Sequence, residues 1–315
     1  MPPSQRTGGG FRLPHDGDAA STAPIFLGGT GRSGKTLVRW MLSSHPRIVV
    51  SRRTEMWPRF SGRFGDLSNP ENLERCLDAM LARKQVAGLE PDVERLRRDF
   101  ALGAPTYARL FALIHEQYAE RNGKPRWGDQ SAGVESFAEE ILTSYPGARM
   151  IHMVRDPRDT YVALLDKGLR RAGAVGRATA SWLSSVGLAE RHAARHPESY
   201  RIIRYEDLVA APGDTMRALC GFLAEAFDPA MVRMEGAHRY DALRAASPDG
   251  IPVSTAYVGA YRDQIEPADL AFIQRAASAP MGSFGYAPDD VQLSTFDRLR
   301  GAVTWPVSRA RMGAA

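Results

Sequence analysis

The chain has 315 residues, 43% of them hydrophobic, and a formal net charge of +5 at pH 7. This length and apolar content suit one large α/β domain, with or without a substrate-binding insertion. Only two cysteines occur, Cys76 and Cys220, which excludes a disulfide framework. The modest basic excess includes no basic block interleaved with aromatic residues, so nucleic acid is not an expected partner.

The first 23 residues are rich in Pro, Gly, Ser and Thr and contain no apolar core. We therefore expect a disordered leader over 1–23 rather than a signal peptide. No apolar run approaches the roughly 18 residues that a bilayer span needs, so no transmembrane segment is expected. These features together predict a cytoplasmic protein. Its oligomeric state stays open, and a homo-oligomer remains among the alternatives.

A short apolar strand predicted at Ile25–Gly28 runs directly into a glycine-rich loop. The loop and the helix start that follows read Gly29-Thr-Gly-Arg-Ser-Gly34-Lys35-Thr36, which satisfies the G-x-x-x-x-G-K-T pattern. Glycines let backbone N–H groups approach an anion, and the positive end of the helix dipole lies at the same point. The sequence therefore predicts a phosphate-binding loop, with the contacts supplied by Gly31, Arg32, Ser33, Gly34, Lys35 and Thr36.

Further short strands are predicted along the chain at Ile48–Ser51, Arg149–Val154 and Arg201–Arg204, with amphipathic helices between them. This alternation predicts a three-layer α/β fold in which helices flank a central, mainly parallel sheet, similar to that of P-loop NTPases. Ligands of such sheets bind beyond the carboxyl ends of the strands. Motifs that follow different strands are therefore expected to meet in one site.

Two later segments, His152-Met-Val-Arg-Asp-Pro-Arg-Asp159 and Arg204-Tyr-Glu-Asp-Leu208, follow the loop and its Ser44-His45-Pro46 sequel. In this order the segments resemble the sulfotransferases that use 3′-phosphoadenosine-5′-phosphosulfate (PAPS), over roughly residues 24–262. The resemblance implies that the loop binds the 5′-phosphosulfate and Arg155 the 3′-phosphate. It also implies that Tyr205 lies beside the adenosine. Ser254 and Arg262 lie in a stretch that resembles the family's late donor-covering segment.

The chain departs from the family pattern at three positions. Lys35 stands where the family usually has threonine, and Gln130, within Trp127–Ser131, stands where a lysine is common. Ala163 replaces a serine that contacts the 3′-phosphate in the family, and Thr160, about one helical turn earlier, is a substitute for it.

The resemblance implies in-line transfer of a sulfuryl group from PAPS, without a metal, to a hydroxyl or amine acceptor. The acceptor class, whether sugar, lipid, peptide or small metabolite, is not readable from the sequence. We expect Arg32 to stabilise the leaving group, with Lys35 sharing that role. Glu55 is the first candidate for the base that takes the acceptor proton, followed by Asp129 and then His45. The alternative for Glu55 is a structural ion pair with Arg52 or Arg53.

We expect one sulfotransferase domain over 24–295, a helical acceptor-side insertion around 70–123, and a C-terminal tail over 296–315. Two other functions remain open. The loop pattern also fits a P-loop ATP-dependent kinase or ATPase, although no predicted apolar strand ends in a convincing Mg²⁺-binding aspartate. The altered region between Ser51 and Glu55 also allows a catalytically inactive nucleotide-binding protein.

Overall fold

The computed structural model describes residues 22–166, 168, 173–235 and 253–313. A five-stranded sheet in the order β2-β3-β1-β4-β5 forms its centre, and every neighbouring pair is parallel. The predicted α/β fold with a parallel sheet is confirmed. The strands are β1 (Ile25–Gly29), β2 (Ile48–Arg52), β3 (Arg126–Gln130), β4 (Arg149–Val154) and β5 (Tyr200–Arg204).

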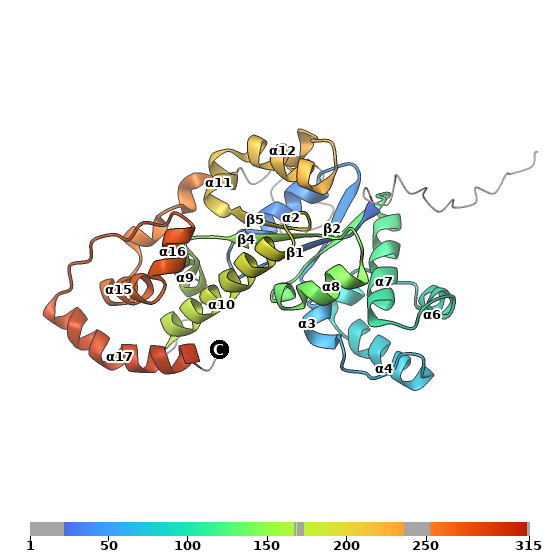
Figure 1. The fold of residues 1–315 in the computed structure, drawn as a ribbon, viewed down its shortest axis with the longest axis horizontal. Helices are drawn as coiled ribbons and strands as arrows, with labels where there is room; N and C mark the ends of the chain where they lie inside the picture. Colours follow the sequence, from blue (N-terminus) through green and yellow to red (C-terminus); the bar gives the residue numbers. More distant parts are fainter. Residues whose placement is uncertain (1–21, 167, 169–172, 236–252, 314–315) are drawn as a thin grey trace, which may run out of the picture.

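Helices cover both faces of the sheet, with α2, α11 and α12 on one side and α7, α8 and α10 on the other (Figure 1). The strands are buried on both faces: in β1, Phe26 packs into one core and its neighbours Ile25 and Leu27 into the other. No described helix combines the length and apolar character that a membrane span requires. The α-helices are α2 (Lys35–Ser43), α3 (Met56–Phe60), α4 (Pro70–Leu81), α5 (Lys84–Ala87), α6 (Val93–Ala101), α7 (Tyr107–Arg121), α8 (Ala138–Ser144), α9 (Pro157–Leu165), α10 (Ala174–Arg195), α11 (Tyr205–Ala210), α12 (Pro212–Leu223), α13 (Ala230–Arg233), α15 (Pro267–Ala276), α16 (Ser278–Ser283) and α17 (Thr295–Gly313), and the 3₁₀ helices are η1 (Val134–Phe137), η3 (Thr255–Tyr257) and η4 (Ala260–Asp263).

Strand β3 is the element that the sequence did not reveal. It lies between β2 and β1, yet its residues are Arg, Trp, Gly, Asp and Gln, which do not read as an apolar run. All five residues are buried, because the structure supplies hydrogen-bond partners for the charged ones. Tertiary contacts therefore outweigh the low strand propensity of this segment.

Two predicted segments take a defined form at the ends of the sheet. The stretch 70–123 is helical, as expected, and forms α4 to α7. The 296–315 tail is helix α17 as far as Gly313, and it packs on α10 and α15. Trp305 donates from Nε1 to the carbonyl oxygen of Ala268 at 3.2 Å, and its ring lies against Phe272. Most of the expected 1–23 leader lies outside the described residues.

Arg126, the first residue of β3, anchors this strand to neighbouring segments. Its side chain is fully buried, and its guanidinium donates to the carbonyl oxygens of Ala23 and Leu223, both at 2.6 Å. It also pairs with the Glu225 carboxylate at 3.2 Å. The half-exposed Arg47 pairs with that same carboxylate from the other side, also at 3.2 Å. The Glu225 carboxylate thus binds one buried and one half-exposed arginine. The contributions of the two arginines to stability can therefore be compared directly.

We expect Arg126→Met to lower the free energy of unfolding by about 3–5 kcal/mol, because it leaves two buried carbonyls and part of a carboxylate without their donor. Arg47→Ala removes only the half-exposed partner of a carboxylate that keeps its contact with Arg126, so it should cost about 0–1 kcal/mol. Urea unfolding of both variants measures the difference. Equal losses in the two variants would show that Arg126 does not organise β3.

Candidate active site

The phosphate loop connects β1 to α2 at the carboxyl edge of the sheet. Its backbone is left-handed at Gly29, Arg32 and Gly34, where φ is 114°, 68° and 97°. A Cβ at Gly34 would lie 2.6 Å from the Tyr205 ring, so only glycine fits there. The Ser33 hydroxyl donates to the Thr30 carbonyl oxygen at 2.8 Å and closes the turn. Such alternation of left- and right-handed residues turns backbone N–H groups into an anion-binding concavity.

Lys35 folds back over this loop from the first turn of α2. Its side chain is buried, and its ammonium donates to the carbonyl oxygens of Gly29 and Thr30. Burial lowers the pKa of Lys35 to about 8, while the nearby Glu135 carboxylate acts to raise it. An ammonium has three donors, so one remains for an anion bound in the loop.

Arg155 brings a second cation to the same loop. It follows the last residue of β4, is 7% exposed, and lies 4.6 Å above the Tyr205 ring. Its guanidinium donates to two carbonyl oxygens, at 3.2 Å to Arg32 in the loop and at 2.6 Å to Tyr257. Among the described residues no carboxylate pairs with it, and its Nε has no partner. A buried cation with only neutral acceptors is suited to bind an anion.

Thr160 lies in the first turns of α9, about one helical turn before Ala163, and is the hydroxyl that the sequence suggested for the 3′-phosphate. Its side chain is buried, and its Oγ1 has no hydrogen-bond partner within the described residues. An orphaned buried hydroxyl costs stability unless a ligand or water satisfies it. The residues present at this edge therefore fit a nucleotide with phosphate groups at two positions.

Asp159 holds the predicted donor-covering segment against α9. Its carboxylate accepts from the backbone N–H groups of Gly259 and Tyr261 at 2.8 and 3.0 Å. The Ser254 hydroxyl caps η3 by accepting from the N–H of Ala256 at 3.1 Å, and its contact with the donor stays a prediction. Arg262 instead pairs with Asp289 at 3.3 Å and is mostly exposed, so the structure does not bring it to the loop. Its contact with the donor stays a prediction.

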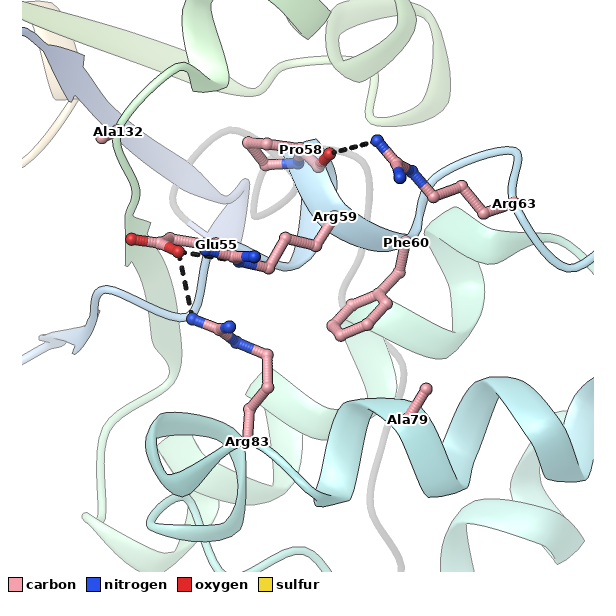
Figure 2. Close-up of a pocket in the computed structure, with 8 residues that line it drawn as sticks. All are labelled: Glu55, Pro58, Arg59, Phe60, Arg63, Ala79, Arg83 and Ala132. Atoms are coloured by element: carbon pink, nitrogen blue, oxygen red, sulfur yellow. Dashed lines mark hydrogen bonds and ion pairs between the residues drawn. The ribbon is translucent and has the colours of Figure 1, made fainter.

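Glu55 lines a pocket of about 600 Å³ next to the carboxyl end of β3 (Figure 2). Its Oε2 accepts from Nε of Arg59 at 2.9 Å and from a terminal nitrogen of Arg83 at 3.0 Å. The predicted ion pair therefore exists, although its partners are not Arg52 or Arg53. The pocket is lined by Glu55, Pro58, Arg59, Phe60, Arg63, Ala79, Arg83 and Ala132.

Asp129, the second candidate base, is fully buried in β3. It accepts hydrogen bonds from the hydroxyls of Ser51, Thr54 and Ser131 at 2.8, 2.6 and 2.7 Å. Burial acts to raise its pKa, but His115 and these hydroxyls hold the pKa of Asp129 below its ordinary value. The three hydroxyls come from the ends of β2 and β3 or directly after them. Because they occupy the carboxylate oxygens of Asp129, this geometry favours a positioning role for Asp129.

His45, the third candidate, lies two residues beyond the end of α2, a helix that extends about 12 Å from Lys35 to Ser43 at 1.5 Å per residue. Both ring nitrogens contact backbone, Nε2 at 2.9 Å from the Ala226 carbonyl oxygen and Nδ1 at 3.2 Å from the N–H of Arg47. The structure therefore separates His45 from the loop.

Glu135 is a site residue that sequence reasoning missed. It is 4% exposed, and its carboxylate accepts from the Ser185 hydroxyl at 2.7 Å and from the Gly29 N–H at 3.4 Å. Its position four residues after Ser131 places it on η1, beside the start of the loop. The one signal available in the sequence was its place directly after the Trp127–Ser131 segment.

One group of side chains among the described residues has the ligand types and spacing of a cation site. Glu139, His192 and His196 have ligand atoms within 4.8 Å of one another. Arg195 lies 3.5 Å from the same carboxylate oxygen, so that oxygen already has a cationic neighbour. None of the three residues belongs to the loop, Arg155 or the Glu55 pocket. The expectation of a metal-free reaction stays a prediction.

Comparison with known proteins identifies relatives in sequence and in fold. Protein-tyrosine sulfotransferase 1 of Danio rerio is 26% identical over 219 residues, which cover 67% of this chain and 56% of the relative. Protein-tyrosine sulfotransferase of Drosophila melanogaster is 23% identical over 237 residues, 73% of this chain and 42% of the relative. The chain thus spans about half the length of the curated relatives it matches.

Two solved structures show a similar fold. The sulfotransferase domain of the Synechococcus PCC 7002 olefin synthase superposes with a TM-score of 0.60 at 22% identity, over 84% of this chain and 96% of that domain. The sulfotransferase domain from the curacin biosynthetic pathway superposes with a TM-score of 0.58 at 20% identity, over 85% of this chain and 99% of that domain. A family model described as the sulfotransferase family matches residues 24–229, from the residue before β1 to the end of α12 and beyond. With more than half of its length inside that match, the chain belongs to the sulfotransferase family.

Proposed function

We propose that this protein transfers a sulfuryl group from PAPS to a hydroxyl group of an acceptor. The observation that carries the proposal is the contact between its two cationic sites. The Arg155 guanidinium donates to the carbonyl oxygen of Arg32 within the phosphate loop, at 3.2 Å. One ligand with two separated phosphate groups would therefore contact both sites, and PAPS has that charge pattern.

In this reaction a bond forms between the acceptor oxygen and sulfur while the bond from sulfur to the 5′-phosphate oxygen breaks. Catalysis of such in-line transfer depends mainly on positioning and on stabilising charge. The loop N–H groups, with the Lys35 ammonium, would hold the 5′-phosphate. Arg32, exposed at the loop tip, would stabilise charge on the leaving phosphate. Glu55 would take the acceptor proton.

The ATP-dependent alternative needs a carboxylate that holds Mg²⁺ beside the loop. Asp129 lies on the strand next to β1, but three hydroxyls donate to its oxygens. Glu135 lies at the loop, but it accepts from Ser185 and Gly29 and faces the Lys35 ammonium. Two observations therefore favour the bisphosphate donor: both carboxylates already have donors, and Arg155 has no carboxylate partner among the described residues.

Adenosine 3′,5′-bisphosphate should bind more tightly than ATP, with or without Mg²⁺. Arg155→Ala should weaken bisphosphate binding by about 10- to 150-fold, because a charge-assisted hydrogen bond is worth about 1.5–3 kcal/mol. Adenosine 5′-phosphate, which lacks the 3′-phosphate, should lose little affinity in the same variant. Isothermal titration calorimetry measures all three ligands.

Arg217→Ala on α12 is the matched control, because that arginine is mostly exposed, already paired with Asp214, and not one of the predicted donor contacts. We expect less than a threefold change for it. Tighter binding of Mg²⁺-ATP than of the bisphosphate by the wild-type protein would refute the sulfotransferase proposal.

Glu55→Gln should lower the rate of transfer by about 10²- to 10⁴-fold, the usual range for loss of a general base, and leave bisphosphate affinity unchanged. Asp129→Asn should act mainly on stability, because it disturbs three buried hydroxyl contacts. Single-turnover rates and melting temperatures of both variants separate the two roles. Full activity of Glu55→Gln together with a well-folded, inactive Asp129→Asn would reverse the assignment.

The pocket beside Glu55 also limits the kind of acceptor. Three arginines, Arg59, Arg63 and Arg83, line this pocket together with a single carboxylate, that of Glu55 (Figure 2). Arg59 and Arg83 share that carboxylate, whereas Arg63 donates to the Pro58 carbonyl oxygen at 3.4 Å and contacts no carboxylate of the described part of the chain. An acceptor that carries an acidic group beside its hydroxyl would balance this charge. Because the relatives are named protein-tyrosine sulfotransferases, a tyrosine flanked by acidic residues is our first acceptor.

Arg63→Ala should raise the KM for a tyrosine peptide with acidic flanks by about three- to tenfold, since an exposed ion pair contributes about 0.2–1 kcal/mol and a partly desolvated one more. The KM for a peptide with neutral flanks should not change. Arg98→Ala, on the exposed side of α6, is the control. Equal effects of Arg63→Ala on both peptides would contradict an acidic acceptor group in this pocket.

A further inference from the structure

Four buried polar side chains form a hydrogen-bonded chain that ends beneath the phosphate loop. The Tyr200 hydroxyl lies 2.9 Å from Nδ1 of His152, and Nε2 of His152 lies 3.1 Å from the Ser185 hydroxyl. Ser185 in turn lies 2.7 Å from one oxygen of Glu135, whose other oxygen accepts from the Gly29 N–H at 3.4 Å. The chain crosses from β5 through β4 and α10 to η1 and the loop.

The donor and acceptor of each hydrogen bond in this series follow from Glu135, at its end. An ionised carboxylate only accepts, so Ser185 must donate to Glu135 and accept from the Nε2–H of His152. Nδ1 of His152 is then unprotonated and accepts from Tyr200. Burial lowers the pKa of His152 to about 4, which agrees with a neutral ring. All three donors therefore point toward Glu135, as a stable buried carboxylate requires.

Glu135 and Lys35 hold the same residue of the loop from two sides. Glu135 accepts from the N–H of Gly29, and Lys35 donates to its carbonyl oxygen. A Cβ at Gly28 would lie 3.0 Å from the Glu135 carboxylate, so the carboxylate packs directly against the loop. The charged and titratable groups that act on Lys35 are Glu135 on η1, Arg53 after β2 and His152 on β4. Of these only Glu135 is an anion.

We propose that Glu135 is a positioning residue of the transfer reaction, which anchors Gly29 and keeps the buried Lys35 ammonium charged for the 5′-phosphosulfate. This proposal rests on the proposed function for its ligand. Its electrostatic part concerns the ligand-free protein and stands independently. Without Glu135, Lys35 would be buried with Arg53 as its charged neighbour, and the ammonium would lose its proton at a lower pH.

Affinity for an anion in the loop should decrease at alkaline pH. The pKa of Lys35 is lowered to about 8, so the ammonium loses its proton as the pH rises through 8, and affinity for an anion in the loop falls above that pH. Glu135→Gln removes the charge that opposes the effect of burial. We expect this variant to begin losing bisphosphate affinity about one pH unit lower than the wild type, with about tenfold weaker binding at pH 8.5.

Two further variants separate charge from structure. Ser185→Ala removes the hydrogen bond to Glu135 but keeps the carboxylate, so the melting temperature should fall while the alkaline limb of binding stays in place. Lys35→Arg substitutes a group that does not titrate in this range, so the alkaline limb should disappear. The matched experiment is calorimetric titration of adenosine 3′,5′-bisphosphate into the three variants and the wild type from pH 6.5 to 9.5.

A second measurement needs no ligand. The chain has four lysines, so NMR titration of lysine labelled with ¹³C at Cε, with Lys35→Arg for assignment, reports Lys35 directly. A lower midpoint in Glu135→Gln and an unchanged one in Ser185→Ala support the proposal. The same midpoint in Glu135→Gln and the wild type would overturn it and leave Glu135 as a purely structural group. Failure of the bisphosphate to bind, with the NMR shift present, would instead count against the proposed donor.

Discussion

The left-handed backbone of the phosphate loop is the constraint on which the site depends. A Cβ at Gly29 would lie 2.4 Å from the Met153 carbonyl oxygen of β4, and one at Gly34 would meet the Tyr205 ring after β5. The loop is therefore shaped by the two strands that lie on one side of β1. The same two strands deliver Arg155 and Tyr205 at their carboxyl ends. Loop geometry and the second cation site are thus consequences of one strand order.

Buried polar groups at the carboxyl edge of the sheet differ in how completely their neighbours satisfy their hydrogen bonds. This difference distinguishes groups with a structural role from groups expected to bind a ligand. Asp129 receives three hydroxyl donors. Arg155, by contrast, has only carbonyl partners, and the Thr160 hydroxyl has none among the described residues. A buried group left incomplete costs stability, so such groups are expected where a ligand completes them.

Sequence patterns revealed what is contiguous along the chain and missed what only the fold assembles. The strands at Ile25–Gly28 and Arg149–Val154 were predicted within a residue of their observed ends, since apolar runs precede their motifs. Strand β3 was missed because its charged residues are satisfied by partners distant in sequence. Glu135 escaped for the same reason: its partners Gly29 and Ser185 lie 106 and 50 residues away. No local spacing encodes such a contact.

Ser131, directly after β3, links the proposed donor region to the proposed acceptor pocket. Ser131 donates from its backbone to the Leu27 carbonyl oxygen of β1, and its hydroxyl accepts from the backbone N–H of Glu55. The rest of the pocket comes from α3 and the loop after it, from α4, and from Arg83, the N-cap residue of α5. These helices carry none of the phosphate-binding residues, so their sequence can change without disturbing the loop. The sequence motifs therefore contain the residues proposed to bind the donor, whereas the residues proposed to contact the acceptor lie on a segment without a motif.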